Sequence, residues 1–301
     1  MRIPKTITID SHRSCNAQCR MCPTQDGSSE LGWMDDNVFD ALSEQIEPLA
    51  KNIQFVQFGV HGEPLLDTKL ESRVARISSM GIRVLIATNA AAMTPKRAQR
   101  LLDAKTDQIF FAVDGTSRET YEKVRIGLSF QKVVGNITEF IRLRNAGGFK
   151  TRAVIRFIEQ RANKHELPEW ERKWKELVTE GLDSLQVVKM HNWAHKLEEI
   201  DSYGAVPCGD LVDNVIVSAD GSIPLCCLDF NSTMPFGNIL KQPLLDILNG
   251  EERRKMVSLH ESGRRGEIEK CKNCYLPERS QNTPETEAFS EAVVNEDLHW
   301  N

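Results

Sequence analysis

The 301-residue chain has no apolar run long enough to cross a membrane, and its N-terminus lacks the apolar core of a secretory signal peptide. It also has no excess of basic residues. With 38 basic and 43 acidic residues the net charge is −5, without the basic surface typical of nucleic-acid-binding proteins. We therefore expect a cytoplasmic globular protein whose partners are neither nucleic acids nor membranes.

Cysteine, by contrast, is plentiful. A reducing cytoplasm favours metal ligands over disulfides for the eight cysteines. No internal repeat or low-complexity segment interrupts the chain.

Hydrophobic patterning predicts strands that alternate with helices over the first two thirds of the chain. The expected helices are 36–49, 67–80, one opening at Thr94-Pro95, 130–146 and 167–180. The expected strands are 6–10, 52–60, 82–89, 108–115, 151–158 and 184–190. Six βαβ-type units predict a parallel sheet, and six are too few for the eight-stranded barrel. The fold class is therefore α/β, an open, partial (β/α)6 TIM-like barrel with functional loops after the strands.

The alternating pattern ends near residue 200, which predicts a barrel over 1–200 and a small α+β domain with a tail over 201–301. In the second part, 214–227 resembles a hairpin that turns at Asp220-Gly221. Two short helices are expected near 242–249 and 251–261, and a weakly amphipathic stretch near 284–295.

Three cysteines follow the first strand with tight spacing, as Cys15, Cys19 and Cys22 in SHRSCNAQCRMCPT. Three thiolates on one loop can hold a four-iron cluster and leave one iron without a protein ligand. The alternative is a zinc site, which needs four ligands and could take His12 as the fourth.

This loop resembles the cluster loop of the radical S-adenosylmethionine (SAM) superfamily. The resemblance implies that SAM binds the open iron through its amino and carboxylate groups. It also implies that Met21, in place of the aromatic residue often found there, packs near the adenine.

Four further segments match the superfamily and supply candidate SAM contacts. Gly62 and Glu63 lie in an HGEP segment that resembles GGEP, where the methionyl amino group binds. Asn89 lies in a TNA segment that resembles TNG. Asp114, in VDG, could approach the SAM ribose or the substrate, or could cap the helix near Ser117. Arg125 could pair with the SAM carboxylate, or could be a solvated arginine at a helix end.

A second cysteine set consists of Cys208, Cys226, Cys271 and Cys274. Four thiolates with a terminal C-x-x-C can close a site, and a structural zinc ribbon is one interpretation. Beside the first motif, the set resembles the shortened SPASM ("twitch") domain, which holds an auxiliary [4Fe–4S] cluster. The layout over residues 5–278 is similar to that of the 2-deoxy-scyllo-inosamine dehydrogenases and epimerases of aminoglycoside biosynthesis.

Cys227 is a surplus cysteine beside Cys226. If both lie on a strand they point to opposite faces, and then only one of them ligates the cluster. Cys227 could donate a hydrogen atom to a substrate radical, as in radical SAM epimerases, or could be a buried apolar residue. The reverse assignment, with Cys227 as the ligand and Cys226 not, stays open.

The resemblance implies two [4Fe–4S] clusters, SAM and an external one-electron reductant such as flavodoxin or ferredoxin. A 5′-deoxyadenosyl radical would take hydrogen from a C–H bond. The outcome would be oxidation or epimerisation of a small polar substrate such as an amino sugar or aminocyclitol. Because the first strand begins so early, we expect no N-terminal peptide-recognition domain, which counts against a peptide-modifying maturase.

The sequence leaves open which residues face the substrate, with candidates His61, Arg156, Lys189 and His191 near the strand ends. A non-catalytic iron–sulfur or zinc protein is the alternative from another class.

Overall fold

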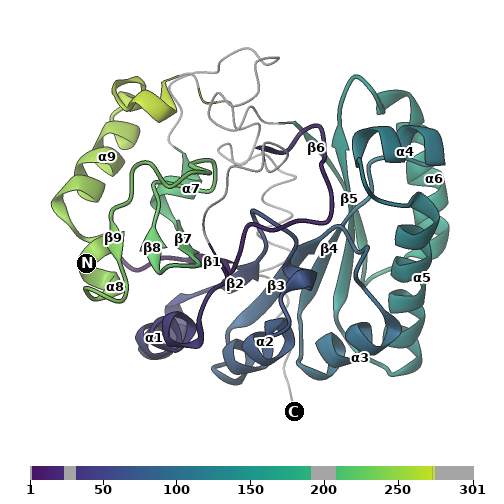
Figure 1. The fold of residues 1–301 in the computed structure, drawn as a ribbon, viewed down its shortest axis with the longest axis horizontal. Helices are drawn as coiled ribbons and strands as arrows, with labels where there is room; N and C mark the ends of the chain where they lie inside the picture. Colours follow the sequence, from purple (N-terminus) through teal and green to yellow (C-terminus); the bar gives the residue numbers. More distant parts are fainter. Residues whose placement is uncertain (1, 24–31, 191–207, 273, 275–301) are drawn as a thin grey trace.

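The computed structural model describes residues 2–23, 32–190, 208–272 and 274. Within these residues the core is a seven-stranded parallel sheet with the order β6-β5-β4-β3-β2-β1-β7 (Figure 1). The strands are β1 (Thr6–Asp10), β2 (Phe55–Phe58), β3 (Arg83–Thr88), β4 (Gln108–Ala112), β5 (Arg152–Glu159), β6 (Ser184–Lys189) and β7 (Asn214–Ser218).

In the described part of the chain from β1 to β6, six helices connect the strands. They are α1 (Asp36–Ile46), α2 (Leu70–Ser79), α3 (Pro95–Asp103), α4 (Arg118–Val124), α5 (Phe130–Ala146) and α6 (Leu167–Leu177). The 3₁₀ segments η2 (Glu47–Asn52), η3 (Pro64–Leu66) and η4 (Lys164–Glu166) lie between them. The helix start expected at Thr94-Pro95 is confirmed, because the hydroxyl of Thr94 accepts the N–H of Arg97 at 3.2 Å, and α5 ends before Gly147.

The two faces of the sheet differ in character. One face packs under the helices in the main hydrophobic core, and its side chains from the strands are almost fully buried. These side chains include Ile7, Val56, Ile86, Ile109, Phe111, Ile155 and Val217. Because side chains alternate along a strand, the in-register residues Thr8, Gln57 and Leu85 share the opposite face. That face mixes polar groups with the small apolar cluster Leu85, Phe110 and Val154.

The predicted α/β partial barrel is confirmed, but the strand count was too low by one. The segment 214–218 was expected to be half of a hairpin, and this pairing is wrong. It forms β7, which pairs in parallel with β1 from Thr6↔Asn214 to Asp10↔Ser218. A five-residue apolar strand followed by a turn carries no sign of whether its partner is local or distant, so the sequence pattern favoured the nearer one.

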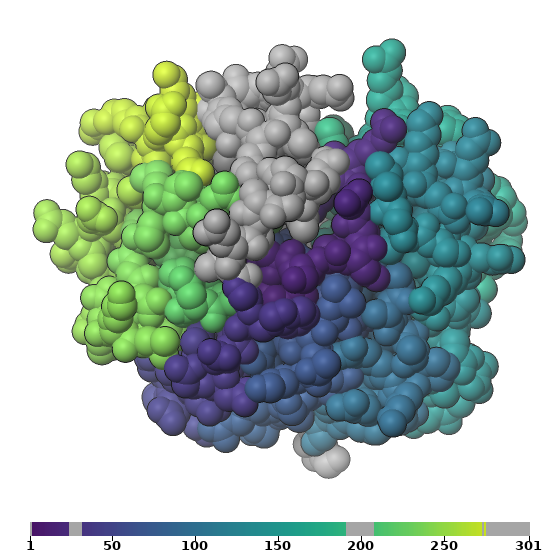
Figure 2. All heavy atoms as spheres, viewed as in Figure 1, coloured from purple at the N-terminus to yellow at the C-terminus, as the bar shows by residue number. Residues whose placement is uncertain are grey.

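The C-terminal part is small. It contains α7 (Gly209–Val212), the short antiparallel pair β8 (Ser222–Ile223) and β9 (Gly237–Asn238), α8 (Leu244–Leu248) and α9 (Glu251–Glu261). The 3₁₀ segments η5 (Arg265–Glu267) and η6 (Glu269–Cys271) follow. Figure 2 shows the purple N-terminal segment running between this green and yellow part and the teal residues of the barrel.

The expected boundary near residue 200 and the stretch 284–295 lie outside the described residues, so the division into two domains stays a prediction. In the part that the structure describes, no helix is long and apolar enough to span a bilayer.

Candidate functional site

The first cysteine loop follows β1 and is held against the end of α4 by backbone hydrogen bonds. The N–H of Gln18 donates to the carbonyl of Ile126 at 2.8 Å, and that of Arg20 to the carbonyl of Val124 at 3.1 Å. Cys19 is buried, whereas Cys15 and Cys22 are half-buried. The loop is thus fixed by main-chain contacts.

Gly62 brings the HGEP segment against this loop. Its φ is +65°, and a Cβ atom there would lie 2.6 Å from the carbonyl oxygen of His12 and 2.8 Å from that of Ser14. The next residue, Glu63, donates its N–H to the carbonyl of Ser14 at 2.9 Å. Only glycine fits this left-handed conformation and this close backbone approach.

The carboxylate of Glu63 joins the ends of β2 and β3. One oxygen accepts the hydroxyl of Thr88 at 2.5 Å and the N–H of Leu65 at 3.0 Å, and the other accepts the N–H of Asn89 at 2.8 Å. Burial raises the pKa of Glu63, while these hydrogen bonds oppose the rise. The side chain therefore has a structural role, and its contact with a SAM ammonium group stays a prediction.

Asn89 and Arg125 approach two of the three cysteine sulfur atoms. The Nδ2 of Asn89 lies 3.9 Å from the Sγ of Cys15, and the Nη1 of Arg125 lies 3.6 Å from the Sγ of Cys19. Donors placed on sulfur favour the thiolate form that binds iron. Asn89 also donates to the Oδ1 of Asn16 at 2.8 Å. Asn16 lies inside the cysteine motif, but the sequence pattern did not single it out.

The guanidinium of Arg125 is also held by the carboxylate of Asp114. Its Nε and Nη2 both lie 2.7 Å from the Oδ2 of the fully buried Asp114, whose Oδ1 accepts the N–H of Ile158 at 2.7 Å. Burial works against the charge on Arg125, but the attraction of Asp114 raises its pKa. The alternative of a solvated arginine at this position is therefore wrong. Asp114 also does not cap α4, because the hydroxyl of Ser117 does so.

The remaining predicted SAM contact, Met21, is buried in the main core. The loop thus has Gly62, Glu63, Asn89, Asp114 and Arg125 around it, as expected, and SAM contact at each of these and at Met21 stays a prediction.

The donor chemistry at this loop fits a four-iron cluster. Burial raises the pKa of the Cys15 thiol to about 12 and also raises that of Cys19, so a positively charged metal centre is needed to keep them as thiolates at neutral pH. Among the described side chains, no three His, Cys, Asp or Glu groups lie close enough to bind one metal ion. A zinc site that includes His12 would need several ligands around one metal ion. A four-iron cluster does not, because each thiolate binds a separate iron.

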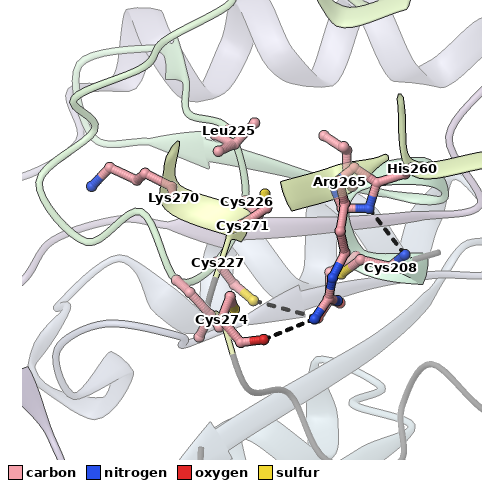
Figure 3. A pocket seen from close by; sticks show the side chains of 12 residues that line it. Cys208, Leu225, Cys226, Cys227, His260, Arg265, Lys270, Cys271 and Cys274 are labelled. Carbon is pink, nitrogen blue, oxygen red and sulfur yellow. Dashed lines mark hydrogen bonds between the residues drawn. The ribbon is translucent and has the colours of Figure 1, made fainter. Parts of the chain in front are cut away.

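The second cysteine set lines one pocket (Figure 3). Its lining includes all four predicted ligands and Cys227, together with Asp210, His260, Arg265 and Lys270. All eight cysteines lie in the described residues, and none forms a disulfide there. Cys208, Cys226 and Cys271, which are separated by 18 and 45 positions in sequence, therefore line one pocket, and their binding of a cluster stays a prediction.

The argument that Cys226 and Cys227 point to opposite faces is wrong. Strand β8 ends at Ile223, and the two cysteines lie in a bend and a turn that follow it, so strand alternation does not apply. Both line the same pocket, and the Sγ of Cys227 lies 3.6 Å from the Oδ2 of Asp210. Cys227 is only 7% exposed.

The surroundings of this pocket also fit a cluster. Burial raises the pKa of Cys208 to about 11 and that of Cys271 to about 12. The Nδ1 of His260 accepts the N–H of Cys208 at 3.2 Å, which leaves the proton on Nε2, a buried atom with no hydrogen-bond partner among the residues that the structure describes. A cluster sulfur atom could accept it. Arg265 points toward Cys274 and donates to its carbonyl at 2.9 Å (Figure 3). Nothing in the sequence pattern marked Asp210, His260 or Arg265.

Comparison with known protein families gives two matches. Residues 9–155 match the Radical SAM superfamily, and residues 208–275 match SPASM, an iron–sulfur cluster-binding domain. The chain belongs to the radical SAM superfamily, in its SPASM/twitch subfamily. Its cofactors are SAM and a [4Fe–4S] cluster at the barrel, with further iron–sulfur binding in the SPASM domain.

Solved structures share the fold over almost the whole chain. BtrN in complex with AdoMet and 2-DOIA is 21% identical with a TM-score of 0.66, over 94% of this chain and 98% of that one. SuiB of Streptococcus suis bound to precursor peptide SuiA is 13% identical with a TM-score of 0.66, over 91% of this chain and 70% of that one.

A curated relative is also similar over part of its length. The "Tungsten-containing aldehyde ferredoxin oxidoreductase cofactor-modifying protein" of Pyrococcus furiosus is 23% identical over 188 residues, which make up 61% of this chain and 51% of that protein. The chain thus spans about half the length of this relative.

Proposed function

We propose that this radical SAM enzyme takes hydrogen from a C–H bond of a small polar substrate, such as an amino sugar or aminocyclitol, and oxidises it. The observation that carries the proposal is the match to BtrN, a protein solved with 2-DOIA bound. The match extends over 98% of the BtrN chain. The polar face of the sheet, with Thr8, Gln57 and Arg156, suits such a substrate. An external one-electron reductant such as flavodoxin or ferredoxin would serve the barrel cluster.

The bound cofactors would supply two things: a SAM-derived radical that takes one hydrogen atom, and an auxiliary cluster that accepts one electron. In the chain, Cys15, Cys19 and Cys22 would hold the first cluster, with the side chains of Asn89 and Arg125 donating toward Cys15 and Cys19. Cys208, Cys226, Cys271 and Cys274, which line one pocket, would hold the second.

Oxidation is preferred to epimerisation because of where the Cys227 thiol lies. Its sulfur contacts Asp210 on α7 and lines the pocket of the auxiliary cysteines. For epimerisation the same thiol would have to return hydrogen to the substrate radical. Epimerisation with Cys227 as the donor is therefore the second candidate.

Product analysis separates the two outcomes. The reduced, reconstituted enzyme is incubated with SAM and a panel of deuterated amino sugars and aminocyclitols, and deuterium is measured in 5′-deoxyadenosine. Oxidation lowers the product mass by two hydrogens, whereas epimerisation in heavy water adds one deuterium. The matched variant is Cys227→Ala, which keeps oxidation and abolishes inversion. Absence of deuterium transfer from every small substrate would contradict the proposal.

Peptide modification is the alternative substrate class, and SuiB, solved with a precursor peptide, supports testing it. Deuterium transfer from a labelled peptide, but from no member of the sugar panel, would favour that class.

A further inference from the structure

His61 lies where the superfamily segment has its first glycine, at the end of β2 and directly before Gly62. His61 is only 2% exposed. Its Nδ1 is 2.9 Å from the Oδ2 of Asp10, at the end of β1, and its Nε2 is 2.8 Å from the carbonyl oxygen of Cys227. One ring therefore spans 166 positions of sequence between the SAM side and the auxiliary side.

Both ring nitrogens face acceptors. A backbone carbonyl can only accept, so Nε2 carries a proton. The Asp10 carboxylate also accepts the Nε of Arg13 at 3.0 Å. Burial raises the pKa of Asp10, but the attraction of His61 and Arg13 outweighs this and lowers it below its ordinary value, which keeps the carboxylate ionised. The ionised carboxylate of Asp10 is therefore the hydrogen-bond partner that Nδ1 of His61 faces.

His61 and Arg13 also contact the segment that follows Cys227. The ring of His61 meets that of Phe230 edge-on at 4.8 Å, and the guanidinium of Arg13 lies 5.1 Å from the centre of the Phe230 ring. The Nη2 of Arg13 donates to the hydroxyl of Ser232 at 3.0 Å. Residues 227–232 are thus attached to the barrel by side chains from the ends of β1 and β2.

We propose that His61 is a positioning residue that ties the SAM-binding HGEP segment to the auxiliary-cluster segment through its hydrogen bond to the carbonyl of Cys227. One side of this link leads through Gly62 and Glu63 to the backbone of Ser14, next to Cys15. The other leads directly to Cys226, an auxiliary ligand. His61 therefore fixes the auxiliary segment relative to the SAM side, whether the reaction ends in oxidation or in epimerisation.

Two isosteric substitutions separate the two hydrogen bonds. In His61→Gln, the side-chain amide reaches the position of Nε2 and can still donate to Cys227. In His61→Asn, the shorter amide reaches the position of Nδ1 and can contact only Asp10. A third variant, Phe230→Leu, removes the ring contact but keeps both hydrogen bonds, and so controls for lost packing.

Hydrogen exchange of the peptide 227–232 is measured by mass spectrometry on anaerobically reconstituted enzyme. We expect exchange at least tenfold faster in His61→Asn than in wild type, and within about threefold of wild type in His61→Gln and Phe230→Leu. Equal exchange in the Asn and Gln variants would overturn the proposal. Loss of protection in His61→Gln alone would also overturn it, so the test survives a failure of the Asn variant to fold.

A spectroscopic readout is added in a Cys15→Ala background, which removes the barrel cluster. We expect the EPR spectrum of the reduced auxiliary cluster to change in His61→Asn and to be restored in His61→Gln. An unchanged spectrum in His61→Asn would count against the proposal. Neither measurement needs a substrate, so failure of this proposal and failure of the proposed function are distinguishable.

Discussion

Replacing Gly62 by alanine tests how closely the HGEP segment contacts the cluster loop. The new Cβ would lie 2.6 Å from the carbonyl oxygen of His12 and 2.8 Å from that of Ser14, and both atoms belong to backbone that cannot rotate away. The left-handed conformation costs a non-glycine residue roughly 1–2 kcal/mol. Overpacking a tight contact costs a further 1–3 kcal/mol, approximately. We therefore expect Gly62→Ala to lower the free energy of unfolding by about 2–5 kcal/mol.

The matched control is Gly148→Ala, after α5. Gly148 has nearly the same conformation, with φ of +68° against +65° for Gly62, but a Cβ there would meet nothing within 4 Å. In Gly148→Ala, the free energy of unfolding should fall only by the cost of the left-handed conformation, roughly 1–2 kcal/mol. Denaturant unfolding of both reconstituted variants under anaerobic conditions, with iron analysis, measures the difference. If the two variants unfold with equal free energy, the close approach of Gly62 to residues 12–14 is refuted.

Three further predictions concern the clusters and the charged groups. Cys15→Ala should lower the iron content from about eight to about four per chain and abolish SAM cleavage. Cys271→Ala should lower the iron content similarly but leave the SAM-binding cluster detectable by EPR. Retention of SAM cleavage by Cys15→Ala would contradict the assignment of Cys15 as a ligand of the SAM-binding cluster. Arg125→Leu leaves the carboxylate of Asp114 buried without its cation and should cost about 3–5 kcal/mol in denaturant unfolding, with a smaller loss in Arg125→Lys; a loss below 1 kcal/mol, roughly, would show that the pair is not buried.

The third of these predictions concerns how the stability of the protein depends on pH. Burial raises the pKa of Glu166, but hydrogen bonds from Ser117 and its neighbour Thr116 outweigh this and lower it below 4.5. A lowered folded-state pKa contributes stability above the unfolded value, and this contribution is lost as pH falls. Glu166→Gln should therefore destabilise the protein by about 1 kcal/mol at pH 7, and the difference in unfolding free energy should narrow below about pH 4.5. A difference that is constant with pH would contradict this cause.

The sequence predicted the local features of the barrel well, because they depend on short-range patterns. Strand 6–10, the helix at 130–146 and the cap at Thr94 lie where the periodicity and the turn residues placed them. The family of the loop at Cys15 was also predictable, because the spacing of its cysteines is a local pattern that needs no knowledge of distant contacts. The ligand set itself stays a prediction.

Distant pairings were not predictable. The link from His61 to Cys227 joins residues 166 positions apart, and neither residue type nor spacing marks it. The same applies to β7, whose partner is β1. The error at Cys226 had another cause: its segment was taken as strand, and the loop conformation there depends on contacts that periodicity does not encode.

The pairing of β7 with β1 has a consequence for dissecting the protein. The cluster loop follows β1, and Cys226 lies eight residues after β7, so one part of each cysteine set follows one of two adjacent strands of the sheet. A truncation at residue 190 would leave β1 with an unsatisfied backbone edge, and a fragment starting at 208 would lose the template for its first strand. Neither half should be expressible by itself as a well-behaved, monomeric iron–sulfur module.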